Sequence, residues 1–416
     1  MTVLIAGGGI AGMALGLSLA EIGVPFRIFE AVKTLRPIGV GINLQPHAVR
    51  ELTEMGLGDA LDTIGLKTEE VAYFNAKGQL IWAEPRGTFA GYDWSQYSVN
   101  RGLLHMMLYD ALRARCGDVV ETGEAVADWR DRRGGVTVDL FDRGTGEARG
   151  RVKGSVLVGC DGINSRIRQR LYPGDGPAKW GGTIMWRGVT RGPRFRTGRT
   201  VAMAGTKDVK FVCYPISDDG PDGSVLNWIA DLTMPEDYTW RQPDWRREGM
   251  IEEFLPHFAD WSFDWLDVPR VITEAEQIYE YPMVDRDPLP WWTQGRATLL
   301  GDAAHAMYPI GSNGASQCIL DARHLARAIR DHGATPAALE AYEATRREPM
   351  NALVLANRGD GPDKILDIVA ERAPDGFTSI DDVIPLSERQ TYADGYKAVA
   401  GMDIAALNAA PPVLGG

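Results

Sequence analysis

The first thirty residues constrain the fold of this chain more than any other stretch. Residues 3–6 form a short apolar run, which predicts a buried parallel strand. The glycine-rich sequence GGGIAG follows at once, residues 13–22 then have helical periodicity, and residues 25–29 form a second apolar strand that closes on Glu30. This order predicts a Rossmann-type strand–helix–strand unit and hence an α/β fold.

This unit contains the glycines, the helix N-terminus and the acidic residue that form a dinucleotide-binding site. Gly7 permits a tight turn, Gly9 lets the backbone approach a pyrophosphate, and Gly12 allows the helix to pack closely on the strand. The first helical turn, which contains Ala11, offers free N–H groups and the positive end of the helix dipole. Glu30 can accept hydrogen bonds from a ribose diol, which favours FAD or NAD over NADP. An ordinary glycine-rich turn is the alternative.

Composition excludes several classes of partner. The 416 residues are enough for two to three domains, and 44% of them are hydrophobic. The net charge of −12 argues against nucleic-acid binding. The sequence has neither a membrane-length apolar run nor a signal-peptide pattern, and its four cysteines are scattered without a CxxC pair or other metal-site spacing. We therefore expect a cytoplasmic protein without a metal, as a monomer or homodimer, that acts on small molecules.

Two further segments of the first half are expected beside the bound cofactor. Residues 36–47 are rich in Gly and Pro and predict a loop that crosses the cofactor, with Val40 in it. Arg101 begins a predicted amphipathic helix and can reach a phosphate or ribityl chain, and we also place Val126, in a predicted strand over 121–129, at this site. A plain surface loop and a solvated arginine are the alternatives.

A second strand-to-helix turn follows residue 158. The apolar strand 152–158 leads into Gly-Cys-Asp-Gly, in which Asp161 can hold the turn. Arg166 and Arg168, in the next helix, can interact with anions.

A third turn of this kind follows the apolar residues 297–300. Asp302, at the end of this strand, can accept a hydrogen bond from a ribityl hydroxyl. The backbone amides from Gly311 through Gly314 to Ala315 precede a predicted helix over 315–330, so they can stabilise negative charge on a flavin ring edge.

The middle of the chain predicts a different kind of domain. Segments separated by Gly, Asp and Pro turns predict an antiparallel sheet, covered by a helix around residues 245–258, with strands near 183–189, 209–215, 224–232 and 275–281. Nine of the twelve tryptophans lie between Trp180 and Trp292, which predicts an aromatic-lined substrate cavity. A core position is the alternative for each aromatic residue expected to face it, namely Trp186, Tyr214, Trp228 and Tyr281.

The predicted fold is thus a Rossmann-like FAD-binding domain with an inserted antiparallel β-sheet substrate domain and a C-terminal helical extension. The extension covers 359–416 and is expected to be partly helical with a flexible end. The substrate domain is expected to cover 75–98 and 179–290. The discontinuous FAD-binding domain is expected to cover 1–74, 99–178 and 291–358.

Three motifs, in this order, resemble the fingerprints of one enzyme family. GGGIAG with Glu30, GCDGINSRIR and GDAAHAMYPIGSNGAS are similar to those of the class A flavoprotein aromatic monooxygenases, the para-hydroxybenzoate hydroxylase-like enzymes. The resemblance covers about residues 2–358, and RPIGVGINLQPHAV, MWRGV and YPMVDRDPLP resemble the 5-methylphenazine-1-carboxylate 1-monooxygenases within it. Ser316 stands where the family often has asparagine, and the tail after Gly359 shows no match.

The resemblance implies FAD as the bound cofactor, NADH or NADPH as a transient electron donor, and O₂ as co-substrate. A flavin C4a-hydroperoxide would hydroxylate an aromatic or N-heteroaromatic small molecule, with or without its decarboxylation. Pro309, Gly311 and Gly314 would position the flavin ring, and Pro309 would also contact the substrate. An FAD-dependent oxidase or reductase without oxygen transfer, and a non-catalytic flavin-binding module, remain the alternatives.

No residue stands out as a general base. His305 is the one histidine in a cofactor motif, and we expect it to orient the Gly-Asp turn rather than to act in catalysis. Arg187 or Lys210 can pair with a carboxylate on the substrate, although each can equally be a solvated strand residue.

Overall fold

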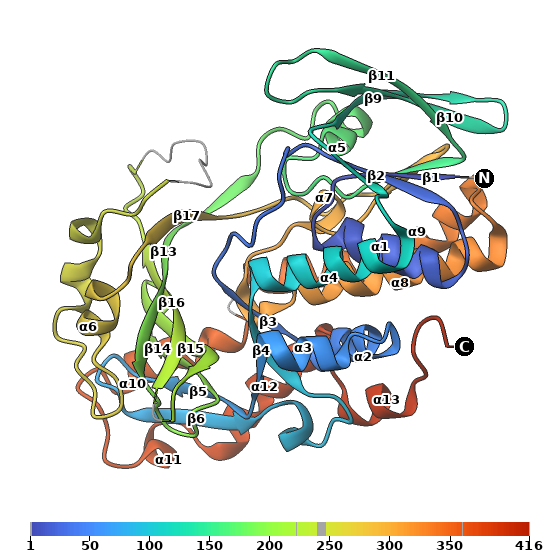
Figure 1. The fold of residues 1–416 in the computed structure, drawn as a ribbon. Coiled ribbons are helices and arrows are strands. Elements are labelled where there is room, and N and C mark those ends of the chain that lie inside the picture. Colours follow the sequence, from blue (N-terminus) through green and yellow to red (C-terminus); the bar gives the residue numbers. More distant parts are fainter. Residues whose placement is uncertain (1, 222, 239–246, 360, 416) are drawn as a thin grey trace.

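The computed structural model describes residues 2–221, 223–238, 247–359 and 361–415. Figure 1 shows two large layers side by side: a parallel sheet with helices beneath it, and a second sheet whose outer side carries α6 (Val268–Thr273). The C-terminal helices run along the bottom of the molecule (Figure 1).

The parallel sheet contains the predicted strand–helix–strand unit. Its six strands have the order β18-β19-β12-β1-β2-β8, and only β18 is antiparallel to its neighbour. Both faces of the sheet are covered, which suits the apolar composition of its strands. The strands are β1 (Val3–Ala6), β2 (Phe26–Glu30), β8 (Val120–Thr122), β12 (Val156–Gly159), β18 (Thr293–Gln294) and β19 (Ala297–Leu299).

Helices cover one face of this sheet and a small antiparallel sheet covers the other (Figure 1). The small sheet consists of β9 (Ala125–Arg132), β10 (Gly135–Phe141) and β11 (Ala148–Gly154). The helices on the first face are α1 (Ile10–Glu21), α4 (Arg101–Cys116), α8 (Gly314–His332) and α9 (Pro336–Arg358). Helix α5 (Arg166–Leu171) instead packs against β9 on the side of the small sheet, and α7 (Asp302–His305) contacts α5 and α9.

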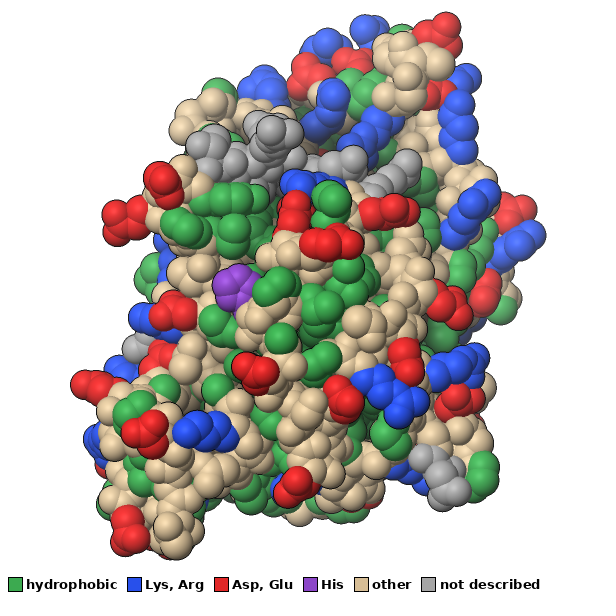
Figure 2. Space-filling view, turned by 90° about the vertical axis from the view of Figure 1, so that its left-hand side faces the viewer, with side chains coloured by type: hydrophobic (Ala, Val, Ile, Leu, Met, Phe, Trp, Pro, Cys, Tyr) green, Lys and Arg blue, Asp and Glu red, His purple; other side chains and the backbone are tan. Residues whose placement is uncertain are grey.

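The second layer is a seven-stranded sheet with the order β17-β13-β16-β15-β14-β5-β6, antiparallel except between β14 and β5. On its outside, charged side chains are scattered between hydrophobic ones (Figure 2). The strands are β5 (Glu70–Phe74), β6 (Leu80–Pro85), β13 (Lys179–Pro193), β14 (Thr200–Gly205), β15 (Val209–Asp219), β16 (Gly223–Thr233) and β17 (Ile278–Asp285).

Two expectations for this layer need correction. The boundary expected after residue 74 lies before residue 70, because β5 pairs with β14 and so belongs to the second sheet. The helix expected over 245–258 is absent from the described part of that range, whose residues 247–258 contain only the short 3₁₀ turns η2 (Ile251–Glu253) and η3 (Leu255–Phe258). Pro256 has no N–H group and so interrupts a continuous helix there.

A three-stranded sheet and short helices connect the two layers. The sheet has the order β3-β7-β4, in which both pairs are antiparallel. Its strands are β3 (Gly41–Leu44), β4 (Gly65–Thr68) and β7 (Gln96–Asn100). The helical elements beside it are α2 (Pro46–Glu54), α3 (Gly58–Ile64) and the 3₁₀ turn η1 (Gly87–Ala90).

The C-terminal extension packs onto both layers. Ile365, Leu366 and Val369 are buried against side chains of β5, β14 and β15. The end expected to be flexible is held in place through residue 415, because Leu414 is buried and the amide of Val413 donates to Glu51. The extension contains η5 (Gly361–Asp363), α10 (Lys364–Arg372), α11 (Ile380–Val383), α12 (Leu386–Val399) and α13 (Ile404–Ala409).

Candidate active site

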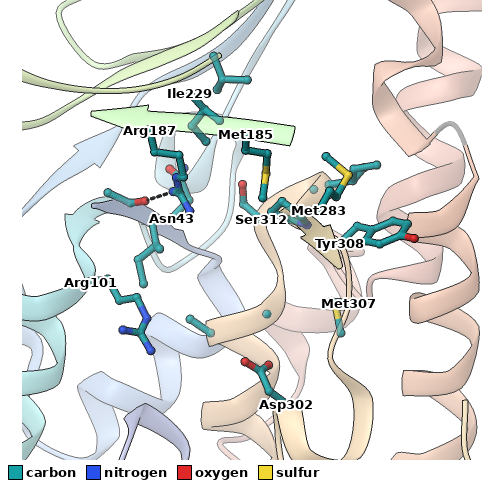
Figure 3. A pocket seen from close by; sticks show the side chains of 18 of the residues that line it. Asn43, Arg101, Met185, Arg187, Ile229, Met283, Asp302, Met307, Tyr308 and Ser312 are labelled. Atoms are coloured by element: carbon teal, nitrogen blue, oxygen red, sulfur yellow. Dashed lines mark hydrogen bonds between the residues drawn. The ribbon is translucent and has the colours of Figure 1, made fainter. Parts of the chain in front are cut away.

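A cavity of about 300 Å³ lies between the two layers. Figure 3 shows Met185, Arg187 and Ile229 at its sheet end and Arg101 and Asp302 at the other end. Its wall is formed by the N-terminal glycine loop, the loop before α8 and the inward face of the seven-stranded sheet. The cavity therefore joins the predicted cofactor motifs to the predicted substrate domain.

The three glycines of the first motif meet different surroundings. Gly7 has φ +101°, and a Cβ atom there would lie 2.4 Å from the carbonyl oxygen of Cys160. A Cβ atom on Gly12 would lie 2.0 Å from the carbonyl oxygen of Gly7, but one on Gly9 would meet no atom of the described residues within 4 Å. The packing of the protein itself requires Gly7 and Gly12, whereas Gly9 keeps the cavity open for a bound group.

The first turn of α1 is free to bind an anion. Within the described chain, no side chain caps this helix, so its first N–H groups remain available. The Glu30 carboxylate accepts from the amides of Gly8 at 2.7 Å and Val32 at 2.8 Å, and thereby holds the loop. His105, which no sequence motif singles out, also contacts this loop, because its Nε2 lies 2.5 Å from the carbonyl oxygen of Gly8.

The loop before α8 forms the opposite wall. Asp302, Pro309, Gly311, Gly314 and Ala315 all line the cavity. The Asn313 side chain does not cap α8, and a Cβ atom on Gly314 would meet no described atom within 4 Å. Two helix N-termini thus face one cavity, which suits a pyrophosphate at one and the electron-rich edge of a flavin ring at the other.

The C-terminal extension supports this loop, although no motif in residues 359–416 indicates such a role. Ser312 has φ +55°, an uncommon conformation for a residue with a side chain. The Tyr396 hydroxyl, on α12, lies 3.1 Å from Asn313 Nδ2, 3.1 Å from the carbonyl oxygen of Ile310 and 3.0 Å from Asn357 Oδ1. The extension therefore fixes the loop from the side opposite the cavity.

Ser316, the departure from the family pattern, also ties the loop to its surroundings. Its hydroxyl accepts from the amide of Gln45 at 3.0 Å, and the Gln45 side chain donates to the carbonyl oxygen of Gly311 at 3.2 Å.

The second motif is held by its own hydrogen bonds, and two of its residues, Cys160 and Gly162, line the cavity. The Asp161 carboxylate accepts from the Ser165 hydroxyl at 2.5 Å and from the amide of Arg166 at 2.7 Å, while burial raises the pKa of its carboxyl group. Arg168 is buried and the anion with which it interacts is Asp175, at 2.7 Å, so its guanidinium group is engaged within the protein. The Arg166 guanidinium lies 4.3 Å from the centre of the Phe141 ring.

Of the other predicted cofactor residues, one lines the cavity and two do not. Arg101 lines the cavity, and its amide donates to the carbonyl oxygen of Val40 at 3.0 Å. Val40 is buried beside it without lining the cavity, and Val126 lies in the hydrophobic core of the parallel-sheet layer.

Strand alternation decides which residues of the seven-stranded sheet face the cavity. On β13, Met185 and Arg187 face it, whereas Trp186 between them points to the other face and stacks on Phe254 at 4.9 Å. On β16, Ile229 and Asp231 face it in the same way. The expectation that Trp186 faces the cavity is therefore wrong, because its neighbours Met185 and Arg187 occupy that face of the strand.

The predicted aromatic lining is mostly replaced by methionine. Trp228 is fully buried behind the sheet, and its indole N–H donates to the Thr190 hydroxyl at 3.0 Å. Tyr281 lies outside the cavity wall and stacks on Tyr279 at 6.1 Å. Of the four predicted aromatic residues only Tyr214 lines the cavity, where burial raises its pKa to about 12. The apolar wall includes Met185, Met203, Met283 and Met307.

The two cationic residues of the sheet have different partners. Lys210 Nζ lies 2.7 Å from Asp363 Oδ2 and 3.4 Å from Asp231 Oδ2. Burial alone would lower the pKa of Lys210, but these two carboxylates raise it well above its usual value. Arg187 donates from Nη2 to the carbonyl oxygen of Gly41 at 2.8 Å, while its buried Nε has no partner among the described residues. Arg187 is thus the less engaged of the two cations.

His305 is buried and absent from the cavity wall of the described structure. Its Nε2 lies 2.5 Å from Asp321 Oδ2, and the same oxygen accepts from the amide of Gly301 at 3.1 Å. This geometry supports an orienting role at the Gly-Asp turn.

Comparison with known proteins identifies the family. The family model described as FAD binding domain matches residues 1–357. Phenazine 1,6-dicarboxylic acid hydroxylase PhzS of Lysobacter antibioticus is 43% identical over 362 residues, which are 86% of this chain and 89% of that protein. Aurachin C monooxygenase/isomerase of Stigmatella aurantiaca is 32% identical over 85% of this chain and 87% of its own length. The chain belongs to the FAD-dependent aromatic monooxygenases.

The fold of this monooxygenase agrees with that assignment. HpxO of Klebsiella pneumoniae, solved with FAD and uric acid, superposes with a TM-score of 0.74 over 99% of this chain and 97% of its own, at 22% identity. The predicted α/β fold with a Rossmann-like FAD-binding domain, the family, the FAD cofactor and the monooxygenase class are confirmed. The helices of the described residues include none that is long and apolar enough to cross a membrane.

Proposed function

We propose that this monooxygenase hydroxylates a fused N-heteroaromatic carboxylic acid, with electrons from NADH or NADPH and oxygen from O₂. The observation that carries the proposal is the cavity itself, in which Arg187 stands among apolar side chains opposite the flavin loops. A flat apolar ring suits methionine walls, because methionine is flexible and makes favourable contacts with aromatic rings. A carboxylate on that ring suits a guanidinium group.

We further propose which residues hold FAD. The amides of the first turn of α1, beside Gly9 and Ala11, would bind the pyrophosphate, and Glu30 would accept from the ribose. Asp302 and Arg101 would contact the ribityl chain and phosphate. FAD, when bound, supplies the oxygen-transfer chemistry.

The loop before α8 would serve the flavin ring in this proposal. Pro309 and Gly311 would position the ring, and the amides of Gly314 and Ala315 would stabilise negative charge at its edge. The methionine and aliphatic side chains of the cavity wall would exclude water from the reacting atoms.

Arg187 is the residue that we propose to hold the substrate carboxylate. Its Nε lacks a partner among the described residues and is buried, so a carboxylate there would satisfy a donor that is otherwise left unpaired. Lys210, the other cation that the sequence offered for this role, is held between two acids. The relative from Lysobacter antibioticus, named for a phenazine dicarboxylic acid, supports a fused N-heteroaromatic acid as the substrate class.

Substrate screening tests the proposal. NADH and NADPH oxidation would be measured with phenazines, phenols, quinolines and N-heteroaromatic carboxylates, alongside peroxide and product mass. We expect a product with one added oxygen atom from an N-heteroaromatic carboxylate. Peroxide without such a product would instead indicate an oxidase, and the absence of NAD(P)H consumption with every compound would indicate a flavin-binding module.

A pair of variants on β13 tests the role of Arg187. Arg187→Met should weaken binding of the carboxylate about ten- to a hundredfold, because a hydrogen bond to a charged group contributes about 1.5–3 kcal/mol. Arg191→Met is the matched control, since Arg191 lies on the same strand, is exposed and pairs with Asp219. Equal affinity in the Arg187 variant and the wild type would contradict this placement of the carboxylate.

We also propose that the enzyme is cytoplasmic and is a monomer or homodimer. The four cysteines are free thiols, which suits the reducing cytoplasm. We expect a monomer or homodimer, to be checked by light scattering.

A further inference from the structure

Three charged side chains meet at one place in the wall of the cavity. Lys210 of β15 and Asp231 of β16 are register partners on neighbouring strands, and Asp363 comes from η5 in the C-terminal extension. All three are buried, with exposed fractions of 7%, 4% and 8%. We call Asp231 and Asp363 the acid pair. Lys210 forms an ion pair with each of them.

The acid pair differs from two other buried carboxylates of the molecule, those of Asp285 and Asp321. Both oxygens of Asp285 accept from Arg358, at 2.6 and 3.0 Å. Both oxygens of Asp321 also have partners. In contrast, Oδ1 of Asp231 and Oδ1 of Asp363 are buried without a hydrogen-bond partner among the described residues. Such atoms are costly, so a complete site is expected to supply donors for them.

We infer that the acid pair accepts a hydrogen bond from a hydroxyl or ring N–H group of the aromatic substrate. This inference rests on the proposed function, because it concerns the same cavity in which Arg187 is proposed to hold the substrate carboxylate. Two carboxylates and one ammonium group leave one net negative charge, and the unpartnered atoms are acceptors. The acid pair therefore favours a donor and disfavours a second carboxylate.

The position of the acid pair also suits the reaction. The 3₁₀ turn η5 packs against η4 (Ile310–Ser312), so that a Cβ atom on Gly361 would lie 2.6 Å from Ile310 Cγ2. The acid pair thus lies beside the loop that faces the flavin. A hydrogen bond from a ring hydroxyl to a carboxylate shifts electron density into the ring, which an electrophilic oxygen transfer requires.

The electrostatics of Asp231 strengthen this role. Burial raises the pKa of its carboxyl group, while Lys210 and Arg187 act in the opposite direction. A more basic carboxylate is a better hydrogen-bond acceptor. With Arg187 binding an acid and the acid pair binding a donor, the cavity would fix the orientation of a planar substrate.

Binding measurements on matched compounds test the inference. The probes are a hydroxyphenazine and a hydroxyquinoline, each compared with its methoxy derivative and its unsubstituted parent, and calorimetry on the FAD-loaded protein gives Kd. Asp231→Asn should weaken binding of the hydroxy compounds about ten- to a hundredfold and change that of the parents less than about twofold. Asp363→Asn should act in the same direction.

Asp219→Asn is the matched control, because Asp219 lies at the far end of β15 and pairs with the exposed Arg191. Melting temperatures establish that each variant is folded. Equal losses for hydroxy compounds and parents would overturn the inference and leave the acid pair as a clamp for the extension. A wild type that binds hydroxy compounds no more tightly than their parents would also overturn it. These outcomes are independent of the proposed function, which fails only if the screen yields no hydroxylated product.

Discussion

The two faces of the seven-stranded sheet are made by alternate residues of the same strands, yet their chemistry differs. The outward face is aromatic and buried, and it packs against η3 and α6. The inward face carries methionine, tyrosine and three charged side chains around the cavity. On the outward face lie Trp186, Phe211 and Trp228, against which Phe254 and Phe258 pack. On the inward face lie Met185, Arg187, Lys210, Tyr214 and Asp231.

This difference teaches that a high density of tryptophan marks the layer that stabilises the substrate domain and not the wall that contacts the substrate. Large rigid rings fill a core well because they bury much surface with little loss of rotamer freedom. A wall that must accept a ligand benefits instead from flexible methionine and from a few placed charges.

Truncating the outward face should have the largest effect. Trp228→Ala is expected to lower the free energy of unfolding by about 5 kcal/mol, the upper end for a fully buried large side chain. Because Trp228 does not touch the cavity, the folded fraction should still couple NAD(P)H oxidation to hydroxylation. Denaturant melts measure the loss of stability, and peroxide yield on the same preparation measures coupling. A variant that is stable but uncoupled would contradict the difference between the two faces.

Removing the ammonium group of the inward face should cost about 3 kcal/mol, because Lys210→Met leaves two buried carboxylates without their cation. Unlike the loss at Trp228, this loss should depend on pH. Burial then raises the pKa of the Asp231 carboxyl group above its unfolded value, so the folded state binds a proton more tightly and is stabilised at low pH. That stability disappears as pH rises through the folded pKa of Asp231.

The destabilisation of Lys210→Met relative to the wild type should therefore be smaller near about pH 5 than near about pH 8. Urea melts of both proteins across this range check the sign. A loss that is the same at every pH, as expected for Trp228→Ala, would show that the two faces do not differ in this way.

The support that the extension gives to the flavin-facing loop should have the smallest effect on stability. Tyr396→Phe removes one hydroxyl group, which contributes about 1 kcal/mol. Since the hydroxyl group contacts Ile310 and Asn313, the variant should release more peroxide per NAD(P)H while its melting temperature falls only slightly. A variant with unchanged coupling would limit Tyr396 to a packing role.

Local chemistry was predictable from the sequence wherever neighbouring residues determine it. The glycines at 7, 9 and 12 and the acids Glu30 and Asp302 lie in turns whose shape depends on adjacent residues, and the cavity wall includes Gly9 and Asp302. The family followed from three such motifs in order.

What the sequence could not provide depends on contacts between distant segments. Trp186 and Met185 alternate along one strand, and only the burial of one face decides which of them meets the cavity. Asp363 and Tyr396 lie after the last recognisable motif, so nothing local indicates that they reach the cavity and its loop. The pairing of β5 with β14 is likewise invisible in either strand alone.

The most direct measurement compares alanine variants at Met185 and Trp186, adjacent residues that face opposite sides of β13. Peroxide per NAD(P)H and melting temperature would be measured for both, with the aromatic substrate that the screen identifies. We predict that Met185→Ala admits water and raises peroxide with a modest fall in melting temperature, whereas Trp186→Ala lowers the melting temperature strongly and leaves the folded fraction coupled. The reverse pattern, with uncoupling at Trp186 and intact coupling at Met185, would contradict the assignment of the inward face as the substrate site.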